Sequence, residues 1–419
     1  MTMASPTCEY CGRCLSVCPS YKHYLVETMG PRARIDLAHA VERGDLVPGE
    51  RYAQSLKSCL QCLACTEICG KGVDGAQIIL NARLAQKDKG WHFKRSLEKA
   101  FTTRFLTNRS LLKRSMTALA LLQKIFPKER EGSVRHLPDA LSGFLGKRSL
   151  PVIAGKSLDE LLPEHNIPKG IPVAGEAVLF AGCFGSLVST TASLRLVATL
   201  NRLGITVHIP KGQSCCGAPA QLSGFEAAFS KAQEHNAKVF APYKGLPVLT
   251  QCATCFRTLS QEYAEAGKDI ADSVLDASVF LHQHYSRDSE KTPENVQALR
   301  PSHAVSPDDP LVVAVHDPCH LRLNPEAGSS LRACLDSLPW IQLTELSEKG
   351  ICCGGGGVSS LKNPKLADEL GQYRAETIRK SQADIVVSQC PGCVLQLNNH
   401  LSRLSARQRA VHALELIAV

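Results

Sequence analysis

Long apolar segments are absent from this sequence of 419 residues. The longest purely apolar runs have about five residues, such as 118–122, whereas a helix that spans a bilayer needs roughly 20. No apolar segment precedes Cys8 either, so a secretory signal peptide does not fit the first residues. We therefore expect a cytoplasmic protein whose thiols stay reduced.

Motifs of several enzyme classes are also missing. No G-x-G-x-x-G follows a strand pattern, so FAD or NAD is expected on another chain and not on this one. No nucleophile–base constellation of the hydrolase kind is present. The glycines at 354–357 are a weak phosphate-binding signal, because no Lys-Ser/Thr follows them. No nucleic-acid partner is expected.

The positive charge of the chain is concentrated in one segment. The net charge is +9, and the residues from Lys87 to Arg130 account for all of it. Part of this segment, 91–126, has apolar residues at helical spacing with basic residues around them. The apolar and basic positions are Phe101, Phe105, Leu112, Met116 and Leu119, and Arg104, Arg109, Lys113 and Arg114. Three interpretations stay open, namely an interfacial helix on anionic lipid, docking against a partner subunit, and packing on the rest of the chain.

What the sequence has in excess is cysteine, nineteen in all. Because a reduced chain cannot use them as disulfides, clustered cysteines should bind metal. The first eight fall into two runs of C-x-x-C-x-x-C-x-x-x-C, which is the spacing of bacterial two-cluster ferredoxins. The runs are Cys8, Cys11, Cys14 and Cys18, and Cys59, Cys62, Cys65 and Cys69.

In ferredoxins of this spacing the fourth cysteine of each run ligates the other cluster. We therefore predict one 4Fe–4S cubane cluster on Cys8, Cys11, Cys14 and Cys69. The second is predicted on Cys59, Cys62, Cys65 and Cys18. Zinc would prefer two separated pairs of ligands. Residues 30–46 between the runs read as an amphipathic helix, which predicts a helical ferredoxin domain and not a compact β-rich one.

Ten of the remaining cysteines form a tandem repeat with an offset of about 136 residues. The spacings are 32, 1, 36 and 3 residues in the first set and 33, 1, 37 and 3 in the second. The two sets are Cys183, Cys215, Cys216, Cys252 and Cys255, and Cys319, Cys352, Cys353, Cys390 and Cys393. Cys334 is left over and reads as a lone buried thiol.

Short apolar runs in each repeat end just before the cysteines. The strands are expected at 177–182, 205–210 and 247–251, and again at 311–317, 340–346 and 384–389. Helical patterns alternate with them, so each repeat should be a small parallel α/β sheet with its cysteines at the carboxyl ends of strands. Five thiolates, two of them adjacent, suit an iron–sulfur cluster that is not a simple cube. A zinc site that uses four of the five is the alternative.

The whole arrangement resembles the iron–sulfur subunits of membrane-associated dehydrogenases. Two ferredoxin motifs precede a tandem C-x31–32-C-C-G-x35–36-C-x-x-C, and "GPRARI" at 30–35 is similar to a Gly-Pro-Arg-Gly-Arg-Ile motif of the glycolate oxidase and D-lactate dehydrogenase subunits. Ala33 replaces the glycine of that motif. Related families are the C subunit of anaerobic glycerol-3-phosphate dehydrogenase and the B and D subunits of heterodisulfide reductase.

The resemblance implies an electron-transfer subunit of an oxidoreductase complex. A partner FAD subunit would oxidise a 2-hydroxy acid, and this chain would pass the electrons toward quinone from the inner face of the cytoplasmic membrane. The resemblance also implies one or two further, non-cubane 4Fe–4S clusters on the repeat cysteines. His316 and His320, which flank Cys319, are candidates for tuning a cluster or relaying protons.

The predicted fold class is therefore multidomain, α plus α/β. We expect a helical ferredoxin domain at 1–90, a basic helical segment and linker at 91–172, and Cys-Cys-Gly domains at 173–300 and 301–419. A thiol-disulfide reductase subunit, a glycerol-3-phosphate dehydrogenase subunit and a zinc-stabilised scaffold around two cubes are the competing functions.

Overall fold

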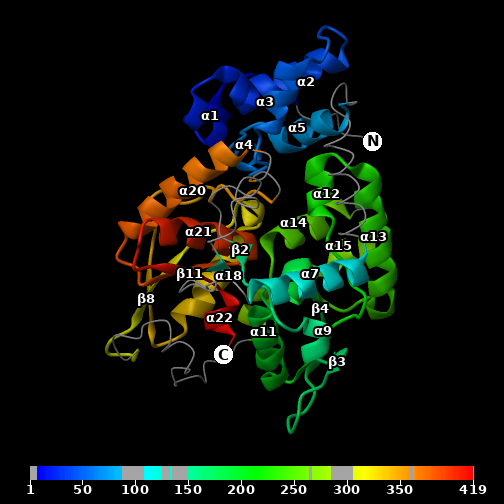
Figure 1. The fold of residues 1–419 in the computed structure, drawn as a ribbon, viewed down its shortest axis with the longest axis vertical. Coiled ribbons are helices and arrows are strands. Elements are labelled where there is room, and N and C mark those ends of the chain that lie inside the picture. The colour runs from blue at the N-terminus through cyan, green and yellow to red at the C-terminus, as the bar shows by residue number, and fades with distance from the viewer. Residues whose placement is uncertain are drawn as a thin grey trace.

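The computed structural model describes residues 7–86, 108–124, 133–134, 150–263, 267–284, 305–357, 360 and 363–418. In these residues a small helical domain lies at one end of the molecule, and two α/β domains make up the rest (Figure 1). Phe101, Arg104 and Phe105 lie outside the described residues.

The N-terminal domain consists of short helices, and no strand occurs in its described part, 7–86. The predicted helix between the cysteine runs is present as α2, and its Ile35 and Ala38 are buried. The prediction of a helical ferredoxin domain is therefore confirmed. Its elements are η1 (Arg13–Leu15), α1 (Pro19–Tyr24), η2 (Glu27–Met29), α2 (Pro31–Glu42), α3 (Glu50–Lys57), α4 (Ala64–Glu67) and α5 (Gly75–Leu84).

The first repeat is a five-stranded sheet with the strand order β3-β5-β4-β6-β7. All pairs are parallel except β3 with β5 at one edge. The elements are α9 (Leu158–Leu161), β3 (His165–Asn166), β4 (Gly175–Phe180), α10 (Gly182–Leu187), α11 (Thr191–Arg202), β5 (Ile205–His208), α12 (Ala218–Ser223), α13 (Glu226–Phe240), η3 (Ala241–Tyr243), β6 (Val248–Thr250), α14 (Ala253–Glu262), α15 (Lys268–Ser273), β7 (Val274–Asp276) and α16 (Ala277–His284).

The second repeat is a four-stranded parallel sheet with the order β11-β10-β8-β9. The elements are β8 (Leu311–Val315), η4 (Cys319–Leu321), α18 (Pro325–Asp336), β9 (Ile341–Thr344), α20 (Pro364–Arg379), β10 (Ile385–Ser388), α21 (Pro391–Arg403), β11 (Arg409–His412) and α22 (Leu414–Ile417). Along the chain, β8 to β11 take the same sheet positions as β4 to β7. The predicted repeated α/β parallel-sheet domains are therefore confirmed.

The two repeats dock through a shared core and a buried polar seam. One hydrophobic cluster joins residues of both sheets, including Leu249 and Val387. Beside it, the Ala253 N–H donates to the Gln389 carbonyl at 3.0 Å, and His412 Nε2 lies 2.8 Å from the Gln251 carbonyl. Gln251 and Gln389 each directly precede the first cysteine of a C-x-x-C. The docking therefore brings the two C-x-x-C motifs to one interface.

The helical domain is attached to both repeats by arginines. Arg83, which is 8% exposed, donates to the carbonyls of Leu56 and Cys59 in its own domain and to that of Leu222 in the first repeat. Arg322 of the second repeat donates to the Cys62 carbonyl at 3.2 Å and pairs with Glu67 at 2.7 Å. These contacts hold the ferredoxin domain against both repeats, and the Arg322 contacts hold Cys62 next to the second repeat.

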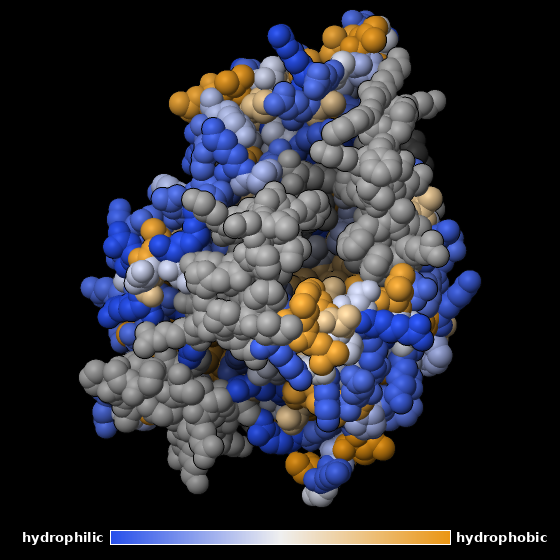
Figure 2. Space-filling model, viewed as in Figure 1, coloured by the Kyte–Doolittle hydropathy of each residue, from blue (hydrophilic) through white to orange (hydrophobic). Residues whose placement is uncertain are grey.

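The described part of the basic segment is helix α7 (Arg109–Gln123), which packs on the first repeat. Arg109 Nη2 and Lys113 Nζ each lie 3.0 Å from a carboxylate oxygen of Asp159 in α9. Figure 2 shows apolar residues gathered over α7, where Leu121 is 58% exposed. Two of the basic residues proposed for lipid contact are thus engaged in internal ion pairs, which favours the packing interpretation for this part of the segment.

Two further features complete the described fold. The strands β1 (Ser133–Val134) and β2 (Leu150–Pro151) form an antiparallel pair. Among the described residues, no helix combines the length and the apolar character needed to cross a membrane.

Candidate metal centres

The eight ferredoxin cysteines line two cavities in the helical domain. The first cavity is lined by Cys8, Cys11, Cys14 and Cys69, and the second by Cys18, Cys59 and Cys62, while Cys65 borders both. Cys18 and Cys69 each face the cavity of the other run. The crossed ligand sets require this distribution, and the assignment of each cluster remains a prediction.

The loops that carry these cysteines turn tightly around the cavities. Gln61 and Leu63 adopt left-handed φ values of 55° and 63°, and Gly12 in the first run has φ of 79°. Such positive φ values between ligands reverse the chain direction and keep successive thiols on one side. The backbone strain is therefore located where a bulky inorganic core would need wrapping.

Burial disfavours ionisation of two of the thiols that line the second cavity, Cys62 and Cys65. It raises the pKa of Cys62 to about 12, and the neighbouring Cys352 and Cys18 act in the same direction. Burial also raises the pKa of Cys65. A bound metal supplies the positive charge that allows such buried thiols to deprotonate. The donor set therefore fits an iron–sulfur cluster.

In each repeat the cysteines gather at the carboxyl ends of strands, as predicted. Cys183 and Cys319 follow the central strands β4 and β8, and each Cys-Cys pair lies in the loop after β5 or β9. Cys252 and Cys390 are the N-cap residues of α14 and α21, so that Cys255 and Cys393 fall in the first turn. The helix N-termini thus point toward the thiols and favour negative charge there.

The glycine after each Cys-Cys pair is required by the backbone. Gly217 and Gly354 have left-handed φ values of 89° and 80°. A Cβ on Gly217 would lie 2.7 Å from the Phe229 ring, and one on Gly354 would lie 2.5 Å from the Ala367 carbonyl. The glycine of each Cys-Cys-Gly therefore allows the chain to turn back directly after the two thiols.

In each repeat, every thiol interacts with at least one other thiol of its set. In the first repeat the Cys183 and Cys215 sulfurs are 3.8 Å apart, and Cys216 interacts with Cys255. In the second, the Cys353 and Cys393 sulfurs are 3.3 Å apart. All nineteen cysteines are free, and Cys334 is buried in the shared core away from both sets.

The cysteine sets are arranged in one series. The thiol of Cys252 in the first repeat interacts with that of Cys390 in the second. At the other end of the second repeat's cysteine set, Cys352 and Cys319 lie close enough to Cys62 for their charges to interact. The cysteine set of the second repeat therefore lies between the ferredoxin cysteines and the cysteine set of the first repeat.

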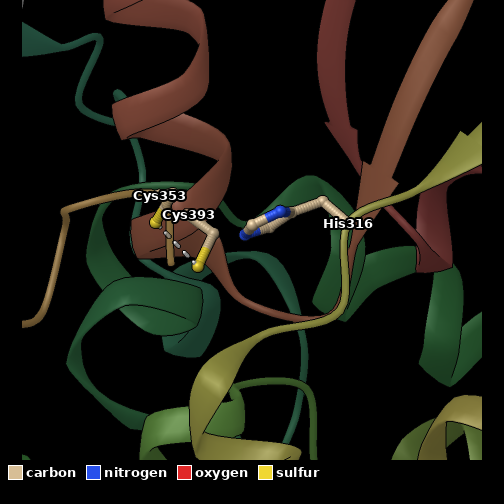
Figure 3. A group of neighbouring side chains, drawn as sticks. All are labelled: His316, Cys353 and Cys393. Carbon is tan, nitrogen blue, oxygen red and sulfur yellow. Dashed lines mark hydrogen bonds between the residues drawn. The ribbon is translucent and has the colours of Figure 1, made fainter. Parts of the chain in front are cut away.

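The two candidate histidines are both buried beside the second repeat. Burial lowers the pKa of His316 and of His320 to about 4, and the charges of Arg374 and Arg257 respectively add to this. Burial therefore favours the neutral form of both rings. Figure 3 shows the His316 ring, at the end of β8, pointing toward Cys353 and Cys393, and one atom from each of these three residues lies within 4.8 Å of the others. His320 Nδ1 instead lies 2.9 Å from Thr254 Oγ1 of the first repeat.

Several residues around the sites were not identified from the sequence. Arg374 is 1% exposed and lies beside His316, and Asn236, which is 0% exposed, binds the Cys215 carbonyl through Nδ2. The signal for Arg374 was present, because it lies on the apolar face of α20 next to buried Ala375 and Ile378. An arginine on the apolar face of a helix indicates that its guanidinium is buried and needs a polar or anionic partner inside the protein.

The fold and the sites together define an iron–sulfur protein in which a two-cluster ferredoxin domain precedes a pair of cysteine-rich domains. Family models agree: the 4Fe-4S dicluster domain matches residues 5–73, and the cysteine-rich domain matches 177–260 and 313–398. The chain therefore contains one dicluster domain and two cysteine-rich domains.

Three relatives indicate the class of complex. The chain is 26% identical to the probable glycolate oxidase iron-sulfur subunit of Bacillus subtilis, over 98% of this chain and 92% of the relative. It is 22% identical to the D subunit of a dihydromethanophenazine:CoB–CoM heterodisulfide reductase of Methanosarcina barkeri, over 99% and 94%. Lactate utilization protein A 2 of Bacillus mycoides is 25% identical over 58% of this chain and 98% of the relative. The predicted resemblance to oxidoreductase iron–sulfur subunits is confirmed.

Proposed function

We propose that this chain is the electron-transfer subunit of a flavin-linked 2-hydroxy-acid dehydrogenase complex, of the glycolate or D-lactate type. A partner FAD subunit would oxidise the acid, and this chain would carry the electrons toward quinone. The similarity over nearly the full length to a glycolate oxidase iron-sulfur subunit supports the substrate class.

The observation that carries the proposal is the serial order of the cysteine sets. The two ferredoxin cavities share Cys65, Cys62 neighbours Cys352, and Cys390 neighbours Cys252. Clusters bound on these four sets would supply one-electron carriers that exchange electrons with their neighbours. The protein holds each set between rigid helices and strands, so the spacing between carriers would be fixed.

The chain's own residues would insulate this series from water. Cys215, Cys216, Cys352 and Cys353 are all at most 3% exposed, and Leu60 packs with Cys352 where the ferredoxin domain meets the second repeat. A dry, apolar surrounding tunes cluster potentials and excludes side reactions. His316 and His320 remain candidates for tuning or proton relay, and their neutral, buried state suits hydrogen bonding.

The test is anaerobic purification of the tagged chain from its own host. We expect a flavoprotein to co-purify, and we expect glycolate or D-lactate to reduce both its flavin and the clusters. In a Cys353→Ala variant, substrate should still reduce the flavin, while electron delivery to a quinone analogue should be lost. Cys334→Ala is the matched control, because Cys334 is a buried cysteine outside every set. Full quinone reduction by Cys353→Ala would contradict the proposal.

A second function, reduction of a disulfide, is favoured by one observation. The C-x-x-C motifs of the two repeats meet at Cys252 and Cys390, so a substrate there would face both sites at once. The similarity over nearly the full length to a heterodisulfide reductase polypeptide points the same way. A flavin-free preparation that reduces a disulfide with dithionite as electron donor would establish this function in place of the first.

A further inference from the structure

The imidazole of His316 has one nitrogen without a partner in a fully buried position. The side chain is 1% exposed, and Nε2 has no hydrogen-bond partner among the described residues. A buried polar nitrogen without a partner is destabilising, so a native protein rarely contains one without a reason. Figure 3 shows that the ring points toward the sulfurs of Cys353 and Cys393.

Arg374 determines which ring nitrogen carries the proton. Its Nε lies 3.3 Å from His316 Nδ1. A guanidinium can only donate hydrogen bonds, so Nδ1 must accept and cannot carry a proton. The imidazole proton is therefore on Nε2, the nitrogen without a partner. A protonated Nε2 has no lone pair for a metal, which excludes direct coordination by this tautomer.

Arg374 is itself held in place by the backbone. Its Nη1 donates to the carbonyls of Ser347 and Glu348, each at 3.2 Å, in the segment that leads into the Cys-Cys pair. Among the described residues, no ion pair joins it to a carboxylate, although its charge interacts with Cys353, with the Asp317 and Glu348 carboxylates and with Cys352. A buried cation is stabilised by nearby anions, and a thiolate-bound centre would add its negative charge to that of the two carboxylates.

We propose that His316 donates its Nε2–H to a sulfur of the centre in the second repeat, and that Arg374 positions the ring for this hydrogen bond. The acceptor would be a cysteine thiolate or an inorganic sulfide. The inference rests on the proposed function, in which the second repeat holds an iron–sulfur cluster.

The first repeat has no such donor at the matching position. The residue that corresponds to His316, three positions before Cys183, is Phe180, which is fully buried and packs against Phe240. On helix α13, the buried polar residue beneath the Cys-Cys pair is the neutral Asn236. The two sites would therefore hold centres with the same cysteines but different surroundings.

The different surroundings should give the two centres different reduction potentials. A hydrogen bond to sulfur and a nearby positive charge both stabilise the reduced form of a cluster, which raises its potential. We therefore expect the centre of the second repeat to be reduced before that of the first. One electron enters and no bond forms or breaks. The second repeat would then retain electrons at the junction between the ferredoxin domain and the first repeat.

The experiment is an anaerobic redox titration of the whole complex, followed by electron paramagnetic resonance. In His316→Phe, which installs the residue of the first repeat, the ratio of reduced to oxidised second-repeat centre at the wild-type midpoint should fall about tenfold, or about 59 mV for one electron. In His316→Gln, which retains an N–H donor, most of this loss should be recovered. In Phe180→Leu, the matched control in the first repeat, the ratio should stay unchanged.

A second readout detects the hydrogen bond itself. The wild-type centre should show an exchangeable proton that is lost in deuterium oxide, and His316→Phe should lack it. A nitrogen coupling typical of a directly bonded ligand would overturn the proposal, as would an unchanged midpoint in His316→Phe. If His316→Phe fails to bind iron, the proton coupling and midpoint of His316→Gln decide. If the wild type shows no second-repeat cluster at all, the proposed function fails and this inference with it.

Discussion

The ion pairs of Asp159 give a prediction that separates packing of α7 from lipid binding. Burial alone would raise the pKa of this carboxyl, but hydrogen bonds from Lys113 and Ser157 and the charge of Arg109 lower it to about 2. The ordinary value is 3.8. The bond from Ser157 lies within the first repeat and solvent screens this partly exposed carboxyl, so the contacts with α7 account for only part of the shift, on the order of 1.4 kcal/mol of stability at neutral pH, which is about one pKa unit.

The lowered pKa of Asp159 determines the pH range in which its ion pairs stabilise the fold. Because the folded-state pKa is depressed, the stabilisation is complete above about pH 4 and is lost as the pH falls toward 2. Asp159→Asn removes the charge and keeps the shape. Hydrogen exchange of the α7 amides should then be about tenfold faster at pH 7, which is the factor that roughly 1.4 kcal/mol represents.

The matched control is Asp269→Asn, which breaks an exposed ion pair with Lys244 and should change exchange little. Binding to anionic vesicles should not depend on Asp159 if α7 is packed on the first repeat. Unchanged exchange in α7 of Asp159→Asn, together with altered vesicle binding, would refute the packing and restore the lipid interpretation.

Three further perturbations test other parts of the structure. Cys18→Ser should damage the cluster on Cys59, Cys62 and Cys65 and leave the other ferredoxin cluster intact, as separate spectroscopic signals would show; the reverse loss would disprove the crossed ligand sets. Gly354→Ala should abolish or distort the second repeat site, because its Cβ would meet a backbone carbonyl at 2.5 Å, whereas Gly245→Ala, at similar φ but with no atom within 4 Å, should lose only the smaller cost of its backbone strain; equal iron content in both would contradict this. Arg83→Met leaves three buried carbonyls without their donor and should increase protease sensitivity at the joint between the ferredoxin domain and the first repeat; an unchanged cleavage pattern would count against that joint.

Much of the fold could be predicted because the strands and helices of each repeat have recognisable apolar patterns within short stretches of the sequence. The apolar run at 205–210 became β5 (Ile205–His208), and the run at 311–317 became β8 (Leu311–Val315). The strands β7 (Val274–Asp276) and β11 (Arg409–His412) were missed. They are short, and only their pairing with β6 and β10 distinguishes them from loop.

For the metal sites too, local sequence patterns predict some features and domain docking determines the others. Which cysteines belong together follows from spacing, because ligands on one loop or at one sheet edge are close by construction. That Cys252 meets Cys390, or that Cys62 meets Cys352, depends on how whole domains dock, and no local periodicity records this. The pairing of Arg374 with His316 likewise joins residues 58 positions apart.

Metal content decides whether all four cysteine sets hold iron–sulfur clusters in one series, which the proposed electron path requires. Iron and acid-labile sulfide should be measured in the anaerobically purified chain, with zinc measured in parallel. We expect about sixteen iron atoms per chain, four for each set, with a matching amount of sulfide and little zinc. About eight iron atoms, with zinc or no metal in the repeats, would contradict a series of four clusters.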